Sequence, residues 1–274
     1  MWTLTGFADE IGPDLDEQLD TLASEGIKHL ELRGVWRKGV LDLTDEELGR
    51  IADALTRRGM RVSAIGSPIG KIKVSDPFEP HLERFRRALF CARTLGAPFI
   101  RLFSFYVPPG EAERHRDEVI HRIRALAAEA EGSGVTLVHE NEKHIYGDIP
   151  ARCLDLVEAV GKPHFRLAWD PANFVQCGVR PFTEGYESLR PYVAYVHVKD
   201  ARLATGEVTV AGAGDGEVRP TLRALADSGF RGFFSLEPHL GRTPGYTRLN
   251  GAERFVAAAR AFKRLLAEEG IPWR

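Results

Sequence analysis

Four potential metal ligands stand in the second half of the chain, each at the end of a short apolar run. They are Glu140 in Thr-Leu-Val-His-Glu-Asn, Asp170 in Arg-Leu-Ala-Trp-Asp-Pro, His197 in Ala-Tyr-Val-His-Val-Lys-Asp, and Glu237 in Phe-Phe-Ser-Leu-Glu-Pro-His. Three carboxylates and one imidazole suit a hard to borderline divalent cation. If the four runs are neighbouring strands of one barrel, the four side chains converge at one end of it.

The elements that must position these residues repeat along the whole chain, with short strand-like runs alternating with amphipathic helical patterns. The predicted strands are Trp2–Phe7, His29–Arg33, Arg61–Ile65, Phe99–Phe103, Thr136–Glu140, Arg166–Asp170, Ala194–Val198 and Phe233–Glu237. The predicted helices are Leu15–Ser24, Asp45–Arg57, His81–Leu95, Glu113–Ala130, Arg152–Ala159, Pro220–Ala226 and Ala252–Glu268.

Eight such units predict one (β/α)8 barrel domain over residues 1–274. Thr44 and Glu47 have the spacing of a helix capping box. Four glycines stand between a helix and the following strand, where positive φ is useful: Gly26, Gly59, Gly96 and Gly134. The alternative is an open doubly wound sheet, but the first strand is not followed by the glycine-rich turn of a dinucleotide fold.

One long insertion interrupts the repeat, at about residues 199–217. It contains Gly206 and the run Gly212-Ala213-Gly214-Asp215-Gly216. We expect a β-hairpin lid or a tight loop over the pocket, because long barrel loops commonly close active sites. A phosphate-cradling loop is the alternative interpretation of the glycines.

The composition narrows the class of protein. Hydrophobic residues at 43%, charged residues at 28% and a net charge of -2 describe a globular protein without a broad nucleic-acid footprint. Three cysteines without Cys-x-x-Cys spacing favour a reducing compartment. Because no apolar run approaches about 18 residues and the first residues lack signal-peptide features, we expect no membrane partner and a cytoplasmic location.

Around the four ligands the sequence resembles the xylose isomerase-like barrels grouped as sugar phosphate isomerases and epimerases. The resemblance is strongest at His139-Glu140-Asn141-Glu142, Trp169-Asp170-Pro171-Ala172-Asn173-Phe174, Val196-His197-Val198-Lys199-Asp200 and Leu236-Glu237-Pro238. It implies one divalent ion held by Glu140, Asp170, His197 and Glu237. That ion is typically manganese in the family, with magnesium, cobalt and zinc as the other candidates.

The implied activity is a metal-dependent isomerase or epimerase of a keto-sugar or related polyol. A cation that polarises the carbonyl acidifies the neighbouring C–H and stabilises the resulting enediolate. Glu140 and Glu237, on opposite sides of that plane, would remove and return the proton, as the paired glutamates of ketose epimerases do. A lyase or dehydratase acting on a keto-sugar, keto-glycoside or keto-inositol would use the same metal site.

Two other functional classes fit less well. An apurinic-site endonuclease of the same superfamily needs further histidines, including one where Asn173 stands. A non-catalytic metal- or sugar-binding barrel would close its site with four protein ligands.

Substrate contacts follow from the same comparison with the family and from position near strand ends. The residues predicted to bind the sugar are Arg202, Asn173, Lys199, His139, Trp169 and Lys143. For Trp169, packing between a strand and a helix is the competing interpretation. Glu31, Arg33 and Ser67, near the ends of early strands, are further substrate contacts or participants in ion pairs and turns. The expected partner is a small-molecule sugar, and the resemblance implies that the chain could also form homo-oligomers.

Overall fold

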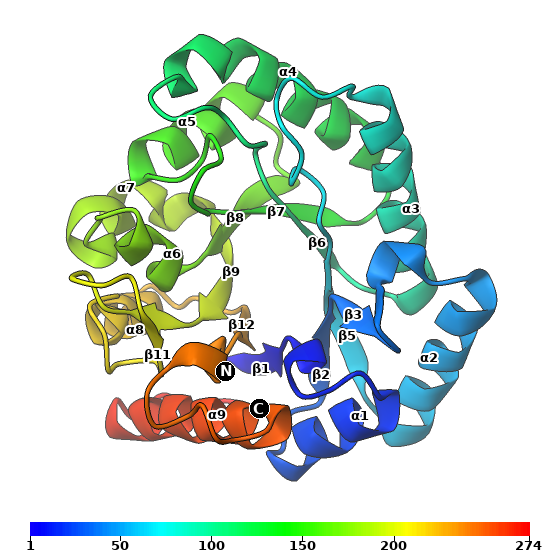
Figure 1. Ribbon diagram of the computed structural model, residues 1–274, viewed down its shortest axis with the longest axis vertical. Helices are drawn as coiled ribbons and strands as arrows, with labels where there is room; N and C mark the ends of the chain where they lie inside the picture. The colour runs from blue at the N-terminus through cyan, green and yellow to red at the C-terminus, as the bar shows by residue number, and fades with distance from the viewer.

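The computed structural model describes residues 1–274, in which eight parallel strands form a nearly closed barrel ringed by helices (Figure 1). The order around the sheet is β1-β12-β9-β8-β7-β6-β5-β2, so neighbours in the barrel follow one another along the chain. An isolated bridge between Phe7 and Glu31 joins the two ends of the sheet. The barrel strands are β1 (Thr3–Gly6), β2 (His29–Leu32), β5 (Arg61–Gly66), β6 (Phe99–Leu102), β7 (Thr136–Glu140), β8 (Phe165–Trp169), β9 (Val193–Val198) and β12 (Phe233–Leu236).

The predicted (β/α)8 barrel is therefore confirmed, and each predicted strand end lies within one residue of the observed one. The helices at predicted positions are α1 (Leu15–Ser24), α2 (Asp45–Arg58), α3 (Glu79–Leu95), α4 (Ala112–Ala130), α5 (Pro150–Val160), α8 (Val218–Asp227) and α9 (Gly251–Glu268). Thr44 and Glu47 form the capping box of α2, which ends at Gly59 with φ 61°. No helix combines the length and apolar character that crossing a bilayer requires.

Between β8 and β9 the structure adds helical segments that the sequence pattern did not predict. These are α6 (Pro171–Gln176), the π-helical turn η3 (Phe182–Tyr186) and α7 (Glu187–Leu189). None is longer than six residues. An amphipathic period needs several turns to be visible, so such short pieces leave little signal.

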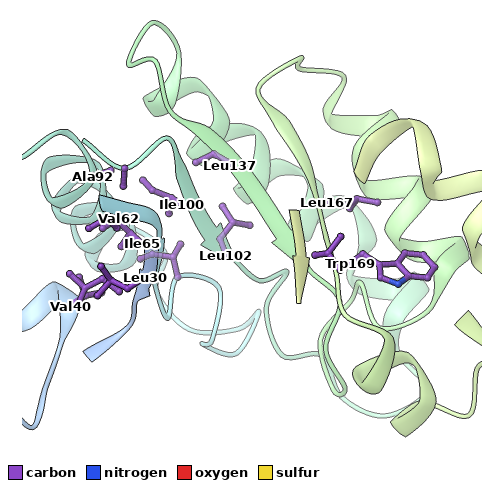
Figure 2. Close-up of a cluster of buried hydrophobic side chains, with 14 of the residues drawn as sticks. Leu30, Val40, Val62, Ile65, Ala92, Ile100, Leu102, Leu137, Leu167 and Trp169 are labelled. Atoms are coloured by element: carbon purple, nitrogen blue, oxygen red, sulfur yellow. The ribbon is translucent and has the colours of Figure 1, made fainter. Parts of the chain in front are cut away.

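Apolar packing is divided between the outside and the inside of the barrel. A cluster of 67 buried hydrophobic residues, part of which Figure 2 shows, includes side chains of both the strands and the surrounding helices. A small separate cluster contains Ala64, Val138, Ala168 and Tyr195. The Tyr195 hydroxyl lies 2.9 Å from Ser63 Oγ, which lies 2.7 Å from Thr5 Oγ1. The barrel interior therefore contains hydroxyl groups at the level of Tyr195. Charged side chains lie nearer the C-terminal ends of the strands.

The insertion at 199–217 contains a short antiparallel hairpin of β10 (Asp200–Ala201) and β11 (Val208–Thr209). The Asp200 carboxylate accepts the N–H groups of Gly212, Gly214 and Gly216 at 2.8–3.0 Å. A Cβ on Gly214 would lie 2.4 Å from the Ala201 carbonyl oxygen, so glycine is required for this close approach. The N–H groups of these three glycines are bound to Asp200, which removes the basis for a phosphate cradle.

A second hairpin, β3 (Gly34–Val35) with β4 (Lys38–Gly39), follows β2. At the ends of the chain, Trp2 pairs with Trp273, and the Arg274 N–H donates to the Trp2 carbonyl oxygen at 2.9 Å. The two termini consequently lie side by side (Figure 1).

The loops after β5 and β6 are joined by backbone hydrogen bonds. The N–H groups of Phe103 and Phe105 donate to the carbonyl oxygens of Ile69 and Gly70 at 2.8 and 3.0 Å. Gly70 has φ 89°, and a Cβ there would lie 2.0 Å from the Phe103 carbonyl oxygen. The Gly70 N–H donates to His81 Nε2 at 2.7 Å. These contacts fix the backbone on both sides of Lys71.

Stability should depend on the protonation of His81. Burial, and then the charges of Arg122 and Arg84, lower the pKa of His81 to about 4. Because the unfolded imidazole titrates near 6.5, the unfolded state binds more protons between these two pH values. The free energy of unfolding should fall as pH drops from about 6.5 to about 4. Urea unfolding across this range, compared with His81→Gln, checks this, because the amide oxygen can accept from Gly70 without titrating. An equal pH dependence in both proteins would contradict it.

Candidate metal centre

The four predicted ligands meet at the C-terminal ends of β7, β8, β9 and β12. Glu140 ends β7, His197 lies in β9, and Asp170 and Glu237 directly follow β8 and β12. Their ligand atoms all lie within 4.8 Å of one another, and each residue is at most 2% exposed. His197 Nδ1 lies 3.2 Å from Glu140 Oε1, 3.8 Å from Asp170 Oδ2 and 3.9 Å from Glu237 Oε2.

This arrangement fits a divalent cation. Ligand atoms about 2.1 Å from one ion are separated by about 3 Å when adjacent and about 4.2 Å when opposite. Although fully buried, both nitrogens of His197 have no hydrogen bond of good geometry, and Asp170 Oδ2 is contacted only by the Lys199 ammonium. Buried polar atoms without hydrogen bonds are costly unless an ion satisfies them. The cluster could therefore hold one ion, and its oxygen-rich set with one nitrogen suits manganese, magnesium or zinc.

The imidazole of His197 is oriented from behind by Glu31. Glu31 Oε2, from β2, lies 3.3 Å from His197 Nε2, and both side chains are fully buried. Glu140 and Glu31 outweigh burial and raise the pKa of His197 well above its ordinary value. With a cation bound, the contact with Glu31 would keep the proton on Nε2 and leave the lone pair of Nδ1 for the ion. A carboxylate behind a histidine ligand is the usual outer partner in metal sites. Glu31 is thus a positioning residue, and the substrate contact considered for it is not supported.

Three cations neutralise the buried carboxylates. Arg101 Nη1 donates to Glu140 Oε2 at 2.8 Å, and Arg33 Nη1 donates to Glu237 Oε1 at 3.0 Å. Lys199 Nζ lies 2.8 Å from Glu237 Oε2 and 2.9 Å from Asp170 Oδ2. Since a buried carboxylate is stable only when it is paired, these cations explain how three acids share this site.

The same contacts set the ionisation of the two glutamates. Burial alone would raise the pKa of Glu140, but His197 and Arg101 hold it below its ordinary value. For Glu237, burial is likewise outweighed by Lys199, His239, His197 and Arg33, and the pKa lies well below the ordinary range. Both side chains are therefore carboxylates at neutral pH, the form that a metal ligand or a general base requires.

Two asparagines link the ligand loops. The Asn173 side-chain amide donates to Glu140 Oε1 at 3.0 Å and to the Asn141 carbonyl oxygen at 2.9 Å. Asn141 in turn exchanges two hydrogen bonds with the backbone of Asp170, at 2.8 and 3.0 Å. Asp170 also caps α6 by accepting the Asn173 N–H at 2.8 Å. Asn173, predicted to bind substrate, is thus in direct contact with the candidate ligand Glu140.

A cavity of about 380 Å³ opens directly onto the cluster. Its lining includes Glu140 and Glu237 together with Arg33, Lys71, Arg101 and His239. Lys199, another predicted substrate residue, lies beneath this space among the ligands. Lys143 is on the outer rim, where Nζ lies 2.8 Å from Gln176 Oε1 and no contact connects it with the cluster.

Three residues predicted to bind the sugar do not line this cavity. Trp169 packs outside the barrel against Phe174 and Tyr186, with ring centroids 5.2 and 5.9 Å away, as Figure 2 also indicates by the direction of its indole. The side chain of His139 points to the opposite face of the sheet from that of Glu140. Its Nε2 lies 2.9 Å from Ser104 Oγ. Arg202 is exposed beyond β10 and makes no side-chain contact with the four ligands.

Four residues near the site were not predicted from the sequence: Arg101 and Lys71, and Asp9 and Glu10, which pair with Arg33. A usable signal existed for Arg101, because a lone charge interrupts the apolar strand Phe-Ile-Arg-Leu. Such a charge inside a barrel strand needs a buried partner. Lys71 and the acids after β1 lie in loops, where charged residues are common and carry no such signal.

Comparison with known proteins identifies the family of this chain and relatives with the same fold. The chain belongs to the family described as xylose isomerase-like TIM barrel, whose model matches residues 19–271. The crystal structure of the IOLI protein with a bound zinc atom has the same fold, with a TM-score of 0.79 at 17% identity. That alignment covers 97% of this chain and 98% of the other.

Two relatives are named as epimerases of phosphorylated substrates. A 2-epi-5-epi-valiolone 7-phosphate 2-epimerase from Actinoplanes sp. is 34% identical over 196 residues, 71% of this chain and 67% of that protein. A probable L-ribulose-5-phosphate 3-epimerase from Mycoplasma pneumoniae is 25% identical over 193 residues, 68% of this chain and 62% of that protein. The matched segments thus span roughly two thirds of each relative's length.

Replacing Glu31 by Gln should weaken metal binding without unfolding the protein. The substitution removes the charge behind His197, and changes to such outer partners reduce metal affinity about 10-fold or more. Calorimetric titration with Mn²⁺ measures the effect. Asp53→Asn, the same chemical change at an exposed position on α2, is the matched control. An unchanged Kd in Glu31→Gln would show that Glu31 does not tune the site.

Replacing Lys199 by Met should destabilise the metal-free protein by about 3 kcal/mol, since two buried carboxylates lose a partner. Saturating Mn²⁺ should recover most of that loss, because the ion neutralises the same groups. Urea unfolding with chelator and with Mn²⁺ measures both values. Lys28→Met, at an exposed position, controls for loss of a surface charge. Equal destabilisation in the two conditions would mean that Lys199 acts through packing alone.

Proposed function

We propose that this protein is a divalent-metal-dependent epimerase or isomerase acting on a keto-sugar or a related polyol. The observation that carries the proposal is the pair Glu140 and Glu237, two ionised carboxylates within one buried cluster that could also hold a cation. The names of the two relatives, both epimerases, support the same reaction class. Manganese is the ion we would supply first.

The residues divide the chemistry between them. A divalent cation in the cluster would act as a Lewis acid on a substrate carbonyl. One glutamate then removes the proton from the adjacent carbon, and the electron pair moves toward the carbonyl oxygen as an enediolate forms. The other glutamate delivers a proton to the opposite face of that carbon. Transfer to the same face of the neighbouring carbon would instead give isomerisation.

The cations around the glutamates support this reaction without taking part as bases. Arg101 and Arg33 each donate to one glutamate, and Lys199 donates to Glu237. Fixed positive charge near the cluster would also stabilise the negative charge that develops on the substrate oxygen. Elimination by a lyase or dehydratase begins with the same proton removal, so it is distinguished by its product and not by this geometry.

The test is a screen of ketoses, ketose phosphates and keto-polyols with Mn²⁺-loaded protein in D₂O. We expect deuterium to enter the carbon beside the carbonyl of the accepted substrate, with conversion to a product of equal mass apart from the label. A product that is lighter than the substrate by one water or by an aglycone would identify a lyase instead. No exchange with any compound, in protein shown to bind one metal ion per chain, would overturn the proposal.

The two glutamates provide the matched variants. Glu140→Gln and Glu237→Gln should each lower kcat for epimerisation by about 1,000-fold, because each removes one of two general bases. Glu158→Gln, at an exposed position on α5, should retain wild-type activity. Full activity in either variant of the pair, once metal content is matched, would show that the reaction does not use two bases.

A further inference from the structure

One wall of the cavity above the cluster carries two cations together with the carboxylate of Glu142. Arg101 from β6 and Lys71 from the loop after β5 both line the space of about 380 Å³ into which Glu140 and Glu237 open. Both cations lie against Phe103, at 4.2 Å from the ring centroid for Lys71 Nζ and 4.5 Å for the Arg101 guanidinium carbon. Gly66, at the end of β5, lines the same wall without a side chain.

These two cations are only partly used by the protein. Arg101 is 4% exposed; one terminal nitrogen donates to Glu140, but its buried Nε has no hydrogen-bond partner. The nearest carboxylate to Lys71 is Glu142, at 3.6 Å, which is too far for a good hydrogen bond. Arg33, on the same cavity, differs because Asp9, Glu10 and Glu237 already surround it.

The main chain at Lys71 is fixed by backbone hydrogen bonds, whereas its ammonium group forms only the longer ion pair with Glu142. Gly70 and Ile72, its two neighbours, accept hydrogen bonds from the N–H groups of Phe105 and Tyr106 at 3.0 and 2.9 Å. Burial, and then Arg101, lower the pKa of Lys71, although Glu142, Glu140 and Glu237 oppose this shift. Lys71 and Arg101 thus place like charges on one cavity, and an anion that contacts both would be attracted by each.

We propose that Lys71 and Arg101 form a subsite for a negatively charged group of the substrate, a phosphate monoester or a carboxylate. This inference rests on the proposed function, since it places the reacting carbon at the cluster and the anionic end of the molecule on the wall formed by β5 and β6. Guanidinium and ammonium groups are the usual protein ligands of such anions. The subsite would make the enzyme selective for charged substrates over neutral sugars.

The test uses inorganic phosphate and acetate as probes of protein loaded with one divalent ion per chain. Calorimetric titration should show phosphate binding whose Kd rises at least about 10-fold in Lys71→Met. Arg101→Lys, which keeps the charge but loses the fork of donors, should also weaken it. Lys73→Met, an exposed lysine in the same loop that does not line the cavity, should bind phosphate like the wild type. If acetate, and not phosphate, shows this dependence, the anionic group is a carboxylate.

Equal anion binding by wild type and Lys71→Met would overturn the subsite, as would no binding of either probe to the wild type. Because these titrations need no turnover, they are independent of the D₂O screen. If anion binding depends on Lys71 but no compound shows deuterium exchange, the proposed function is wrong and the anion subsite is still supported. With an accepted substrate, Lys71→Met should raise KM for the charged compound at least about 10-fold while changing kcat little.

Discussion

The site depends on one electrostatic constraint, the burial of three carboxylates around one imidazole at the end of the barrel. Glu140, Asp170 and Glu237 are each at most 2% exposed, and their ligand atoms face one another within 4.8 Å. Such a group of acids is stable only with opposite charge close by. Arg101 and Lys199 supply part of that charge from the protein itself. The four strands that carry ligands therefore cannot be understood apart from the residues that neutralise them.

The two glutamates have closely matched surroundings although they come from different strands. Each is held at both oxygens, one by an arginine and the other by a second donor: Arg101 and Asn173 for Glu140, Arg33 and Lys199 for Glu237. Hydrogen bonds at both oxygens fix the orientation of a carboxylate and keep it ionised. A pair of bases fixed in this way is preorganised for a reaction that removes a proton on one side and returns it on the other.

The barrel and the four ligands were predictable because their signals are regular. Eight apolar runs recur with helical patterns between them, and the ligands Glu140, Asp170, His197 and Glu237 each end one run. What surrounds the ligands was less predictable, because it depends on side-chain direction. Neighbours along a strand point to opposite faces, so His139 lies behind the sheet although it adjoins a ligand. Conversely, the contacts of Arg101 and Lys71 come from elements far away in sequence, which no local pattern encodes.

The candidate ligands and the charged residues around them come from two different sets of barrel strands. Strands β7, β8, β9 and β12 provide the four ligands, whereas β2, β5, β6 and their loops provide Glu31, Arg33, Lys71 and Arg101. The ligands are mutually constrained, since moving one alters the distances to the other three. A loop residue such as Lys71 has fewer contacts of this kind, with its ammonium group against Phe103 and Glu142. Under the proposed function, substrate preference could therefore change through the second set of elements while the proton chemistry at the first set stays the same. This separation is a physical basis for one barrel family to act on different charged or neutral substrates.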